Sequence, residues 1–308
     1  MSIKFREKLL LAGIESVYGV EEALNGSNAI LAKDLEFTPL ESNSIERGLE
    51  KPYLGAEEKI VSGEHVTISF KVELQGSGVA GTAPACGTLL RAAGFAETVT
   101  ASTMVEYDLA ATNYESATFF FFIGNNLHKA VGARGNVSLE MEAGIPYLAF
   151  EFTALYVAPV TGAAPTPDWS AWQKPTPTGE GRTSNFTLQG YSAKPHKLDI
   201  DVGQAVEYIE TLTAAEVMIT NRQASGSVTI EAPDLATKDY FASIMTNQTG
   251  ALSIQHGQTA GLICKVDAPN VQLESPNYSE ANGIATLELS LIPIPTNAGN
   301  DEVKFTFE

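Results

Sequence analysis

The sequence predicts a mainly β fold built from two tandem β-sandwich or barrel modules, each flanked by one short α-helix. Three observations predict it. Several segments alternate apolar and polar residues with the period of two that half-buried strands show. Glycine, proline and asparagine separate these segments, as expected of turns between strands. Similar strings also recur in the same order in the two halves of the 308 residues.

The clearest strand covers residues 65–74, where every second residue from Val66 to Leu74 is apolar and the others are polar. The segment at residues 117–123 contains four consecutive phenylalanines and is apolar on both faces. Such a strand is either central in a sheet packed on both sides or buried by a neighbouring subunit. Further strands are expected at residues 136–141, 147–157, 216–220, 227–231, 252–255, 261–266, 271–273, 284–292 and 303–307.

Two helices are expected, one in each half. Residues 85–93 form a short apolar stretch that Gly94 can end. Residues 234–247 begin with Asp234, a good N-cap residue, and their apolar residues fall near helical spacing.

Residues 159–183 interrupt the strand pattern with five prolines mixed with glycine, threonine and alanine. Proline cannot donate to a sheet ladder and favours extended backbone, so this segment is predicted to be a linker. Trp169 and Trp172, the only tryptophans, lie in it. They either pin the linker onto its own modules or anchor a contact with another subunit. The predicted organisation is a first module with an N-terminal arm (1–158), the linker (159–183) and a second module (184–308).

The two halves resemble each other along the chain. Residues 136–140 (NVSLE) match residues 270–274 (NVQLE), and residues 66–68 match residues 228–230 (both VTI). Residues 150–152 (FEF) correspond in the same way to residues 287–289 (LEL). The predicted elements follow the same order in each half, which indicates a duplicated module. The spacing places extra residues in the first half, roughly between residues 76 and 115.

The charge disfavours nucleic-acid or membrane binding by positive charge. The chain has 37 acidic and 19 basic residues, a net charge of −18, whereas a protein that grips phosphates needs the opposite sign. No run of about 18 apolar residues occurs, so no membrane span is expected. No signal peptide is expected either, and two cysteines form no disulfide framework, so the sequence favours a reducing cytoplasm.

The residues that carry chemistry form no catalytic, cofactor or metal motif. The four histidines show no metal-binding spacing, and no nucleophile elbow or phosphate-binding loop occurs. Cys86 and Cys264 are expected to be small buried residues. The acidic residues Asp199, Asp201, Glu207 and Glu210 lack the order of a calcium loop, and Glu140 and Glu142 are interpreted as a solvated strand face. The sequence therefore predicts a structural protein, with no enzymatic activity and no cofactor.

The first half resembles the major tail tube proteins of bacteriophages with long, non-contractile tails (siphophages). The resemblance rests on residues 10–55 (LLAGIESVYGVEEALNGSNAILAKDLEFTPLESNSIERGLEKPYLG), 65–74 (HVTISFKVEL), 85–95 (ACGTLLRAAGF), the phenylalanine strand and residues 136–152 (NVSLEMEAGIPYLAFEF). The second half resembles another copy of the same fold.

The resemblance implies a structural virion protein that assembles into stacked rings around a channel through which DNA passes. Inner strands of neighbouring copies would join into one barrel. Two modules per chain imply trimeric rings with pseudo-sixfold symmetry, the alternative being hexamers. The implied partners are copies of itself, the tape measure protein, and tail-tip and tail-terminator proteins, with passing DNA not bound specifically and no membrane. The implied location is the virion tail, after assembly in the bacterial cytoplasm.

Three regions and one strand are the candidates for contacts within and between rings. The first is an arm over residues 1–26, expected to become ordered on a neighbour. The second is the polar segment 41–64, which is either an inter-ring loop or an ordinary surface loop. The third is the tryptophan-bearing linker. The candidate contact residues are Leu9, Leu10, Ile14, Arg47, Tyr53, Lys59, Phe120, Phe122, Trp169 and Trp172.

Three other functions compete with this interpretation. One is another β-rich virion component, such as a decoration or baseplate protein, or a tube component of a secretion apparatus. Another is a carbohydrate-binding β-sandwich, whose exposed aromatic residues would be Tyr107, Tyr114, Tyr191, Trp169 and Trp172. An enzyme is the third, and it lacks any signature motif.

Overall fold

The computed structural model describes residues 3–308, and almost all regular structure in them is β. The first half contains β1 (Lys8–Ile14), the short 3-10 helix η1 (Gly26–Asn28), β2 (Ala29–Ile30), β3 (Lys33–Glu46), β4 (Lys59–Glu73), α1 (Gly87–Ala92), β5 (Phe95–Thr100), β6 (Met104–Leu109), β7 (Ala117–Ile123), β8 (Asn126–Met141) and β9 (Tyr147–Thr161). The second half contains β10 (Thr183–Leu188), β11 (Pro195–Asp201), β12 (Gln204–Glu210), β13 (Ala215–Arg222), β14 (Ser225–Glu231), α2 (Tyr240–Met245), β15 (Thr249–His256), β16 (Cys264–Ala281), β17 (Ile284–Pro293) and β18 (Lys304–Phe307). The predicted mainly β fold is confirmed.

The two halves repeat one strand order. Hydrogen-bonded neighbours in the first half run β3-β4-β9-β8-β7-β1, and those in the second run β11-β14-β17-β16-β15-β10. A short helix follows the second strand of each series, α1 after β4 and α2 after β14. The repeated order fits the tandem modules expected from the sequence.

Long bent strands connect the layers of each half. The first part of β8 pairs with β7, while its last residues pair with β11. The bend coincides with a register shift between Val131 and Arg134, where Gly132 adopts a positive φ of 64°. Bulges of this kind re-aim a strand. In the same way, β16 pairs with β18 at its start and with β17 after Val271.

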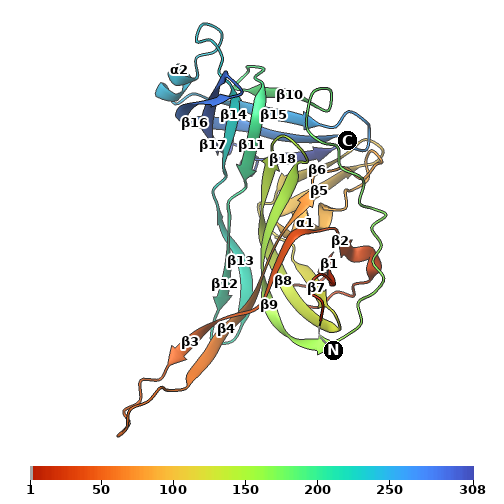
Figure 1. Cartoon of the computed structure of the whole chain (residues 1–308), viewed down its shortest axis with the longest axis vertical. Helices are drawn as coiled ribbons and strands as arrows, with labels where there is room; N and C mark the ends of the chain where they lie inside the picture. The colour runs from red at the N-terminus through yellow and green to blue at the C-terminus, as the bar shows by residue number, and fades with distance from the viewer. Residues whose placement is uncertain (1–2) are drawn as a thin grey trace.

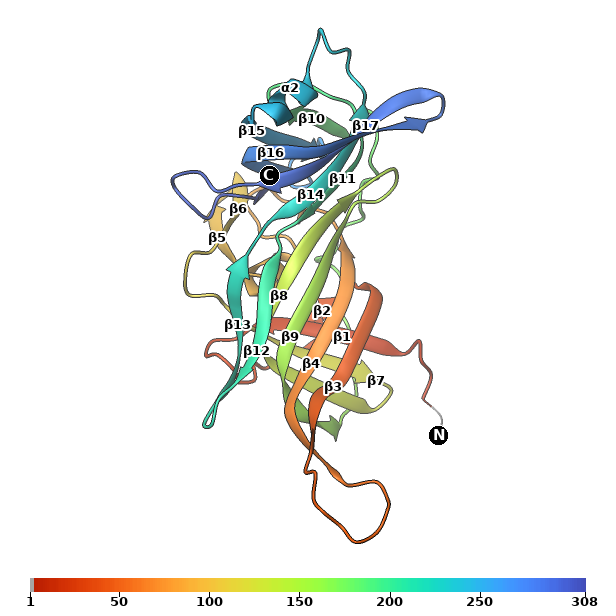
Figure 2. The ribbon, with the colours of Figure 1, turned by 90° about the vertical axis from the view of Figure 1, so that its left-hand side faces the viewer.

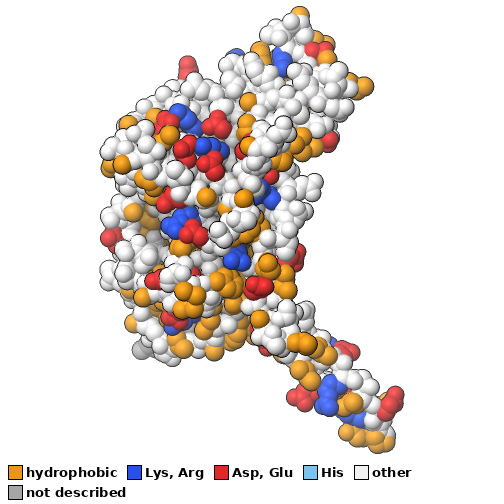
Figure 3. All heavy atoms as spheres, turned by 180° about the vertical axis from the view of Figure 1, so that it is seen from behind, with side chains coloured by type: hydrophobic (Ala, Val, Ile, Leu, Met, Phe, Trp, Pro, Cys, Tyr) orange, Lys and Arg blue, Asp and Glu red, His pale blue; other side chains and the backbone are white. Residues whose placement is uncertain are grey.

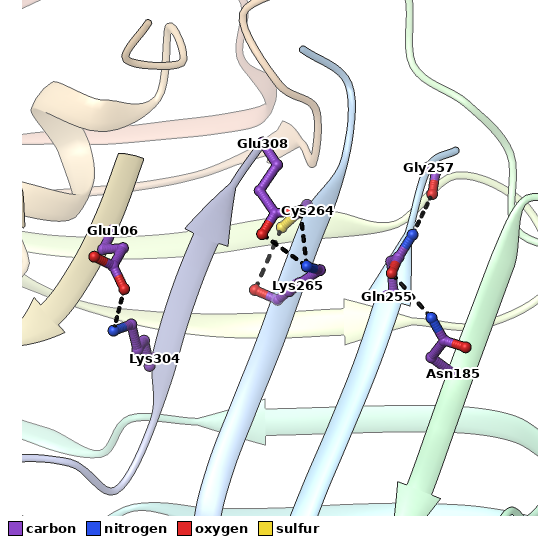
Figure 4. A network of polar contacts seen from close by, with 8 residues as sticks. All are labelled: Glu106, Asn185, Gln255, Gly257, Cys264, Lys265, Lys304 and Glu308. Carbon is purple, nitrogen blue, oxygen red and sulfur yellow. Dashed lines mark hydrogen bonds and ion pairs between the residues drawn. The ribbon is translucent and has the colours of Figure 1, made fainter. Parts of the chain in front are cut away.

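The halves share one core and one sheet. β8 of the first half pairs with β11 of the second, and a single hydrophobic cluster contains residues from both halves. The β5–β6 hairpin, which lies where extra residues were predicted, pairs with β18 at the C-terminus. Polar side chains also join neighbouring strands from β6 through β18, β16 and β15 to β10 (Figure 4). The pairs are Lys304–Glu106 at 2.5 Å, Lys265–Glu308 at 2.7 Å and Asn185–Gln255 at 3.0 Å.

The expectation of a free N-terminal arm is wrong for residues 8–14, which form the buried strand β1. β1 pairs along its length with the phenylalanine strand β7. Phe119 and Phe121 enter the main core, while Phe120 and Phe122 pack in a second cluster with Leu9 and Leu11. Both faces of β7 are therefore covered within one chain. Residues 1 and 2 of the predicted arm lie outside the described residues.

The second helix is shorter than predicted. α2 covers only Tyr240–Met245, and its N-cap is Asp239, whose side chain accepts from the Ala242 amide at 2.9 Å. Asp234 instead accepts from the Ala236 amide in a preceding turn. The apolar residues at helical spacing over residues 234–247 therefore cover a turn followed by a short helix. No helix among the described residues is long and apolar enough to cross a membrane.

The linker lies against the body of the protein. The Trp172 Nε1–H donates to the Ala29 carbonyl at 2.9 Å, and the Asp168 amide donates to the Gly26 carbonyl at 2.8 Å. The His256 ring bonds to the Thr176 carbonyl at 2.9 Å. Trp172 thus pins the linker, as one of the two alternatives expected, whereas Trp169 remains 43% exposed.

Two hairpins lie outside the sandwich strands, and only one of them projects away from the body. The β3–β4 hairpin projects from the lower end of the molecule, and segment 41–64 is half strand and half a loop at residues 47–58 (Figure 1). The β12–β13 hairpin instead lies beside β8 and β9 (Figure 2). The Tyr18 hydroxyl accepts from the Val217 amide at 2.6 Å, and Arg134 donates to the Val217 carbonyl at 2.7 Å.

Candidate assembly interface and polar sheet face

One face of the main sheet is polar across both halves of the chain. It is built by β3, β4, β9, β8, β11, β14, β17 and β16, and we call it the polar face. The strand register aligns its side chains in rows that cross the sheet. One row contains Glu73, Tyr147, Glu140, Asp199, Ser227, Ser290 and Glu274.

The opposite face of these strands is the core. Residues that alternate with the polar row are almost fully buried, among them Val72, Leu139 and Leu289. Period-two alternation in each strand thus produces one face buried in the core and one face exposed to solvent. Because β8 pairs with β11, the alternation stays in phase from the first half into the second.

Carboxylates outnumber cations on the polar face. The carboxylates are Glu36, Glu41, Glu73, Glu140, Glu151, Asp199, Asp201, Glu231, Glu274 and Glu288, and the cations are Lys33, Lys71, Arg134 and Lys197. Glu151, Glu274 and Glu288 are exposed. A sheet face of this composition repels polyanions.

The cations on this face are held by neighbouring groups. The Lys71 ammonium contacts both Glu140 carboxylate oxygens, at 2.5 and 2.7 Å, although β9 separates the two strands. The small Ala149 lies opposite Lys71 on β9 and leaves room for this contact. Lys197 lies 2.6 Å from Asp199, and this hydrogen bond raises the pKa of Lys197.

The joint between the halves is an antiparallel ladder with side-chain support. Leu198 pairs with Met141 and Asp201 with Ser138. Beyond the ladder, the Asn136 side chain donates to Asp201 at 2.6 Å and accepts from the Gln204 amide at 3.0 Å. A groove of about 800 Å³ lies over the joint, lined by residues of β8, β11, β14 and β17.

Among residues 3–308, the eight-stranded sheet that carries the polar face ends in two open strand edges. β3 pairs only with β4, and the part of β16 after Gln272 pairs only with β17. In the repeated strand order, β3 corresponds to β11 and β16 corresponds to β8. The two open edges are therefore the counterparts of the two strands that join inside the chain.

The projecting β3–β4 hairpin carries apolar side chains in water. Figure 3 shows them along the projection and at its tip. Ile45 is 52% exposed, Tyr53 70% and Leu54 fully exposed. The ion pair Lys59–Glu46 at 2.7 Å joins the ends of its two strands, and Lys51–Glu57 at 3.4 Å lies within its loop. Exposed apolar groups gathered on one projection are typical of a protein–protein contact.

A family model described as "Phage tail tube protein" matches residues 6–303. The chain belongs to the phage tail tube protein family. A search of curated proteins finds no match. The family is a structural one and places the chain in the virion tail, in association with other tail components. This match supports the tail tube protein among the interpretations that the sequence left open.

Apart from Trp172, which pins the linker, the candidate contact residues of this tail tube protein fall into two groups. Leu10, Phe120 and Phe122 are buried within the chain, Leu9 is nearly so, and Ile14 packs against the core. Their side chains stabilise the subunit, and sequence reasoning could not distinguish this burial from burial by a neighbour. The accessible candidates are Tyr53 and Trp169, together with Arg47 and the ion-paired Lys59 on the hairpin.

The two thiols and Tyr107 lie in the core of this tail tube protein. Cys86 and Cys264 are buried, as expected, and burial raises the pKa of the Cys86 thiol to about 12. Tyr107, a candidate for a sugar-binding cleft, is fully buried and donates to Glu97 at 2.6 Å. Residues 3–308 contain no cluster of three or more metal-ligating side chains. Asp199 and Asp201, two of the acidic residues that lack the order of a calcium loop, lie on the polar face.

Proposed function

We propose that this chain, as a tail tube protein, assembles into closed rings that stack into a hollow tube, and that the polar face lines the channel through which phage DNA passes. The polar face carries the proposal, since it continues over eight strands and ends at two complementary open edges. Open edges are a hazard in a monomer and become joints in a closed ring.

We propose that the β3 edge of one copy pairs with the β16 edge of the next, in the manner of the β11–β8 joint inside the chain. Three copies would contribute twenty-four strands, eight from each. With strands about 4.8 Å apart and tilted by about 40°, such a barrel is roughly 45 Å wide between backbones. Two copies would give a barrel roughly 30 Å wide, which inward side chains narrow further. The trimer, with pseudo-sixfold symmetry from its two modules, is thus the favoured ring.

The exposed β3–β4 hairpin is the candidate contact to the next ring, because it projects beyond the sandwich and carries exposed apolar side chains. We also propose the finer assignments that the family leaves open. These are the module bounds 1–158 and 184–308 with the linker 159–183, a siphophage tail, assembly in the host cytoplasm, and tape measure, tail-tip and tail-terminator proteins as partners.

Negative-stain electron microscopy of the concentrated, purified protein tests this proposal. Hollow tubes or stacked rings are the expected result, with threefold symmetry in end-on averages. Sixfold averages with one chain per repeat would keep the tube and reject the trimer. Small monodisperse particles at every concentration, also after addition of tail-tip proteins, would contradict self-assembly.

A further inference from the structure

The cations of the polar face already contact other groups of the same chain, and these contacts affect whether they can bind DNA phosphates. Lys71 is held by both oxygens of Glu140, and Lys197 by Asp199 at 2.6 Å. Arg134 donates to the Val217 and Tyr114 carbonyls at 2.7 and 3.0 Å. The Lys33 ammonium lies 4.2 Å from the centre of the Tyr147 ring.

We propose that Glu140 and Asp199 act as masks that keep Lys71 and Lys197 from binding DNA phosphates. The inference rests on the proposed function, because it requires the polar face to meet the DNA. A free lysine is a strong point-charge ligand for phosphate. A phosphate that approaches Lys71 would have to displace two carboxylate oxygens already in contact and would meet the excess negative charge of the face.

The geometry of the Lys71–Glu140 pair supports a role beyond stability. Both side chains are about one third exposed, and exposed ion pairs contribute little to folding. The pair bridges two strands across Ala149 and lies beside the joint between the halves. Lys197 and Asp199 lie on β11 at the same joint. Both masks therefore sit near the middle of the polar face.

The test compares the duplex-DNA affinity of purified variants by fluorescence anisotropy at low salt. Glu140→Gln with Asp199→Asn removes the masks and leaves two free lysines. We expect DNA binding at least tenfold tighter than that of the wild-type chain. Two phosphate contacts give a log–log salt slope of about −1.8, so affinity should fall roughly 60-fold between 20 and 200 mM salt.

Two further variants separate masking from net charge. Adding Lys71→Gln and Lys197→Gln to the first variant restores the wild-type net charge and removes the freed lysines, so binding should return to the wild-type level. Glu115→Gln with Glu308→Gln makes the same change in charge as the first variant and frees Arg91 on α1 and Lys265 at the start of β16, both outside the polar face.

The DNA affinities of these variants either support or overturn the inference. Tight, salt-dependent binding by the first variant alone supports the masks. Wild-type affinity in the first variant, or equal binding by the Glu115/Glu308 control, overturns them. Electron microscopy of the same samples distinguishes failure of the proposed function, since a chain that forms no tube contradicts that proposal independently of DNA affinity.

Discussion

At the residue scale, His256 shows how one buried side chain fastens distant segments. It is 2% exposed, and its Nε2 lies 2.9 Å from the Thr176 carbonyl in the linker. A carbonyl only accepts, so Nε2 carries the proton. The Nδ1 atom then accepts from the Thr183 hydroxyl at 3.0 Å. The neutral ring thereby ties the linker and β10 to β15.

This environment predicts a loss of stability in mild acid. Burial lowers the pKa of His256 below its usual 6.5, so the unfolded chain binds a proton more readily than the folded one. Stability is therefore complete above about pH 6.5 and falls as the pH drops towards the folded pKa. Burial lowers the pKa of His128 in the same direction. We expect the melting temperature to fall between pH 7.5 and 5.5, by about 2–4 °C for each kcal/mol lost.

Thermal melts of the wild-type chain and of His256→Gln at several pH values measure this effect. Glutamine can still donate to Thr176 and does not gain a proton in this range, so its melting temperature should depend less on pH. The remaining slope belongs to His128 and to the carboxylates. Parallel curves for the two proteins would show that His256 does not carry the effect.

Glu15 shows why such residues could not be predicted from the sequence. Its carboxylate is nearly buried and accepts from the Gly132 amide at 2.7 Å, the Ser116 hydroxyl at 2.6 Å and the Thr118 hydroxyl at 2.9 Å. These donors lie about a hundred residues away along the chain. In the sequence, Glu15 is an isolated acid after an apolar stretch, with no local signal of its partners.

At the element scale, the alternation of apolar and polar residues predicted the strands that have one buried face and one solvent-exposed face. β4, β14 and β17 belong to this class, and β7 was predicted with its observed bounds. β1 was missed because both of its faces are apolar and it lies at the N-terminus, where a free arm fits equally well. β11 was missed because its alternation is short, with only Leu198 and Ile200 buried between the polar residues of the strand.

The β3–β4 hairpin leads to a prediction about tube formation. Tyr53 and Leu54 at its turn are exposed, and their burial against the next ring would stabilise stacking by roughly 1.5–3 kcal/mol each. Tyr53→Ser with Leu54→Ser should leave folding unchanged and raise the protein concentration needed for tubes at least tenfold. Sedimentation of assembled material over a concentration series measures this threshold.

Leu212 offers a matched control. It is also fully exposed at a hairpin turn, but its hairpin, β12–β13, already packs on β8 and β9 of the same chain. Leu212→Ser should therefore assemble like the wild-type chain. An unchanged threshold for the Tyr53/Leu54 variant would remove the hairpin turn from the stacking contact.

At the scale of the whole molecule, the repeat was visible in the sequence, whereas the joint was not. Short matches such as residues 136–140 and 270–274 lie on β8 and β16, which hold equivalent places in the two strand orders. The pairing of β8 with β11 has no local signature, because it depends on how two distant segments meet. The shared core likewise could not be read from a pattern of separate modules.

The repeat converts the joint inside the chain into a prediction for the joint between chains. Asp199 lies opposite Glu140 in the β11–β8 ladder. By the strand register, Glu36 on β3 corresponds to Asp199, because the row Glu36–Ser69–Glu151–Asn136 repeats the row Asp199–Ser227–Ser290–Glu274 where β8 and β16 leave β7 and β15. Ser279 on β16 corresponds to Glu140, because their partners Thr286 and Tyr147 each lie four residues before the partner in that row. Glu36 of one copy should therefore lie opposite Ser279 of the next.

Cysteine cross-linking of assembled material tests this register and the ring size together. Directly opposed residues of an antiparallel pair lie close enough for a disulfide, and the native Cys86 and Cys264 are buried. Glu36→Cys with Ser279→Cys should give a ladder of linked chains under oxidising, denaturing conditions that ends at three chains. Glu36→Cys with Glu274→Cys, five residues out of register, should link poorly. A ladder that continues to six would replace the trimeric ring by a hexameric one, and no linkage in intact tubes would show that these edges do not meet.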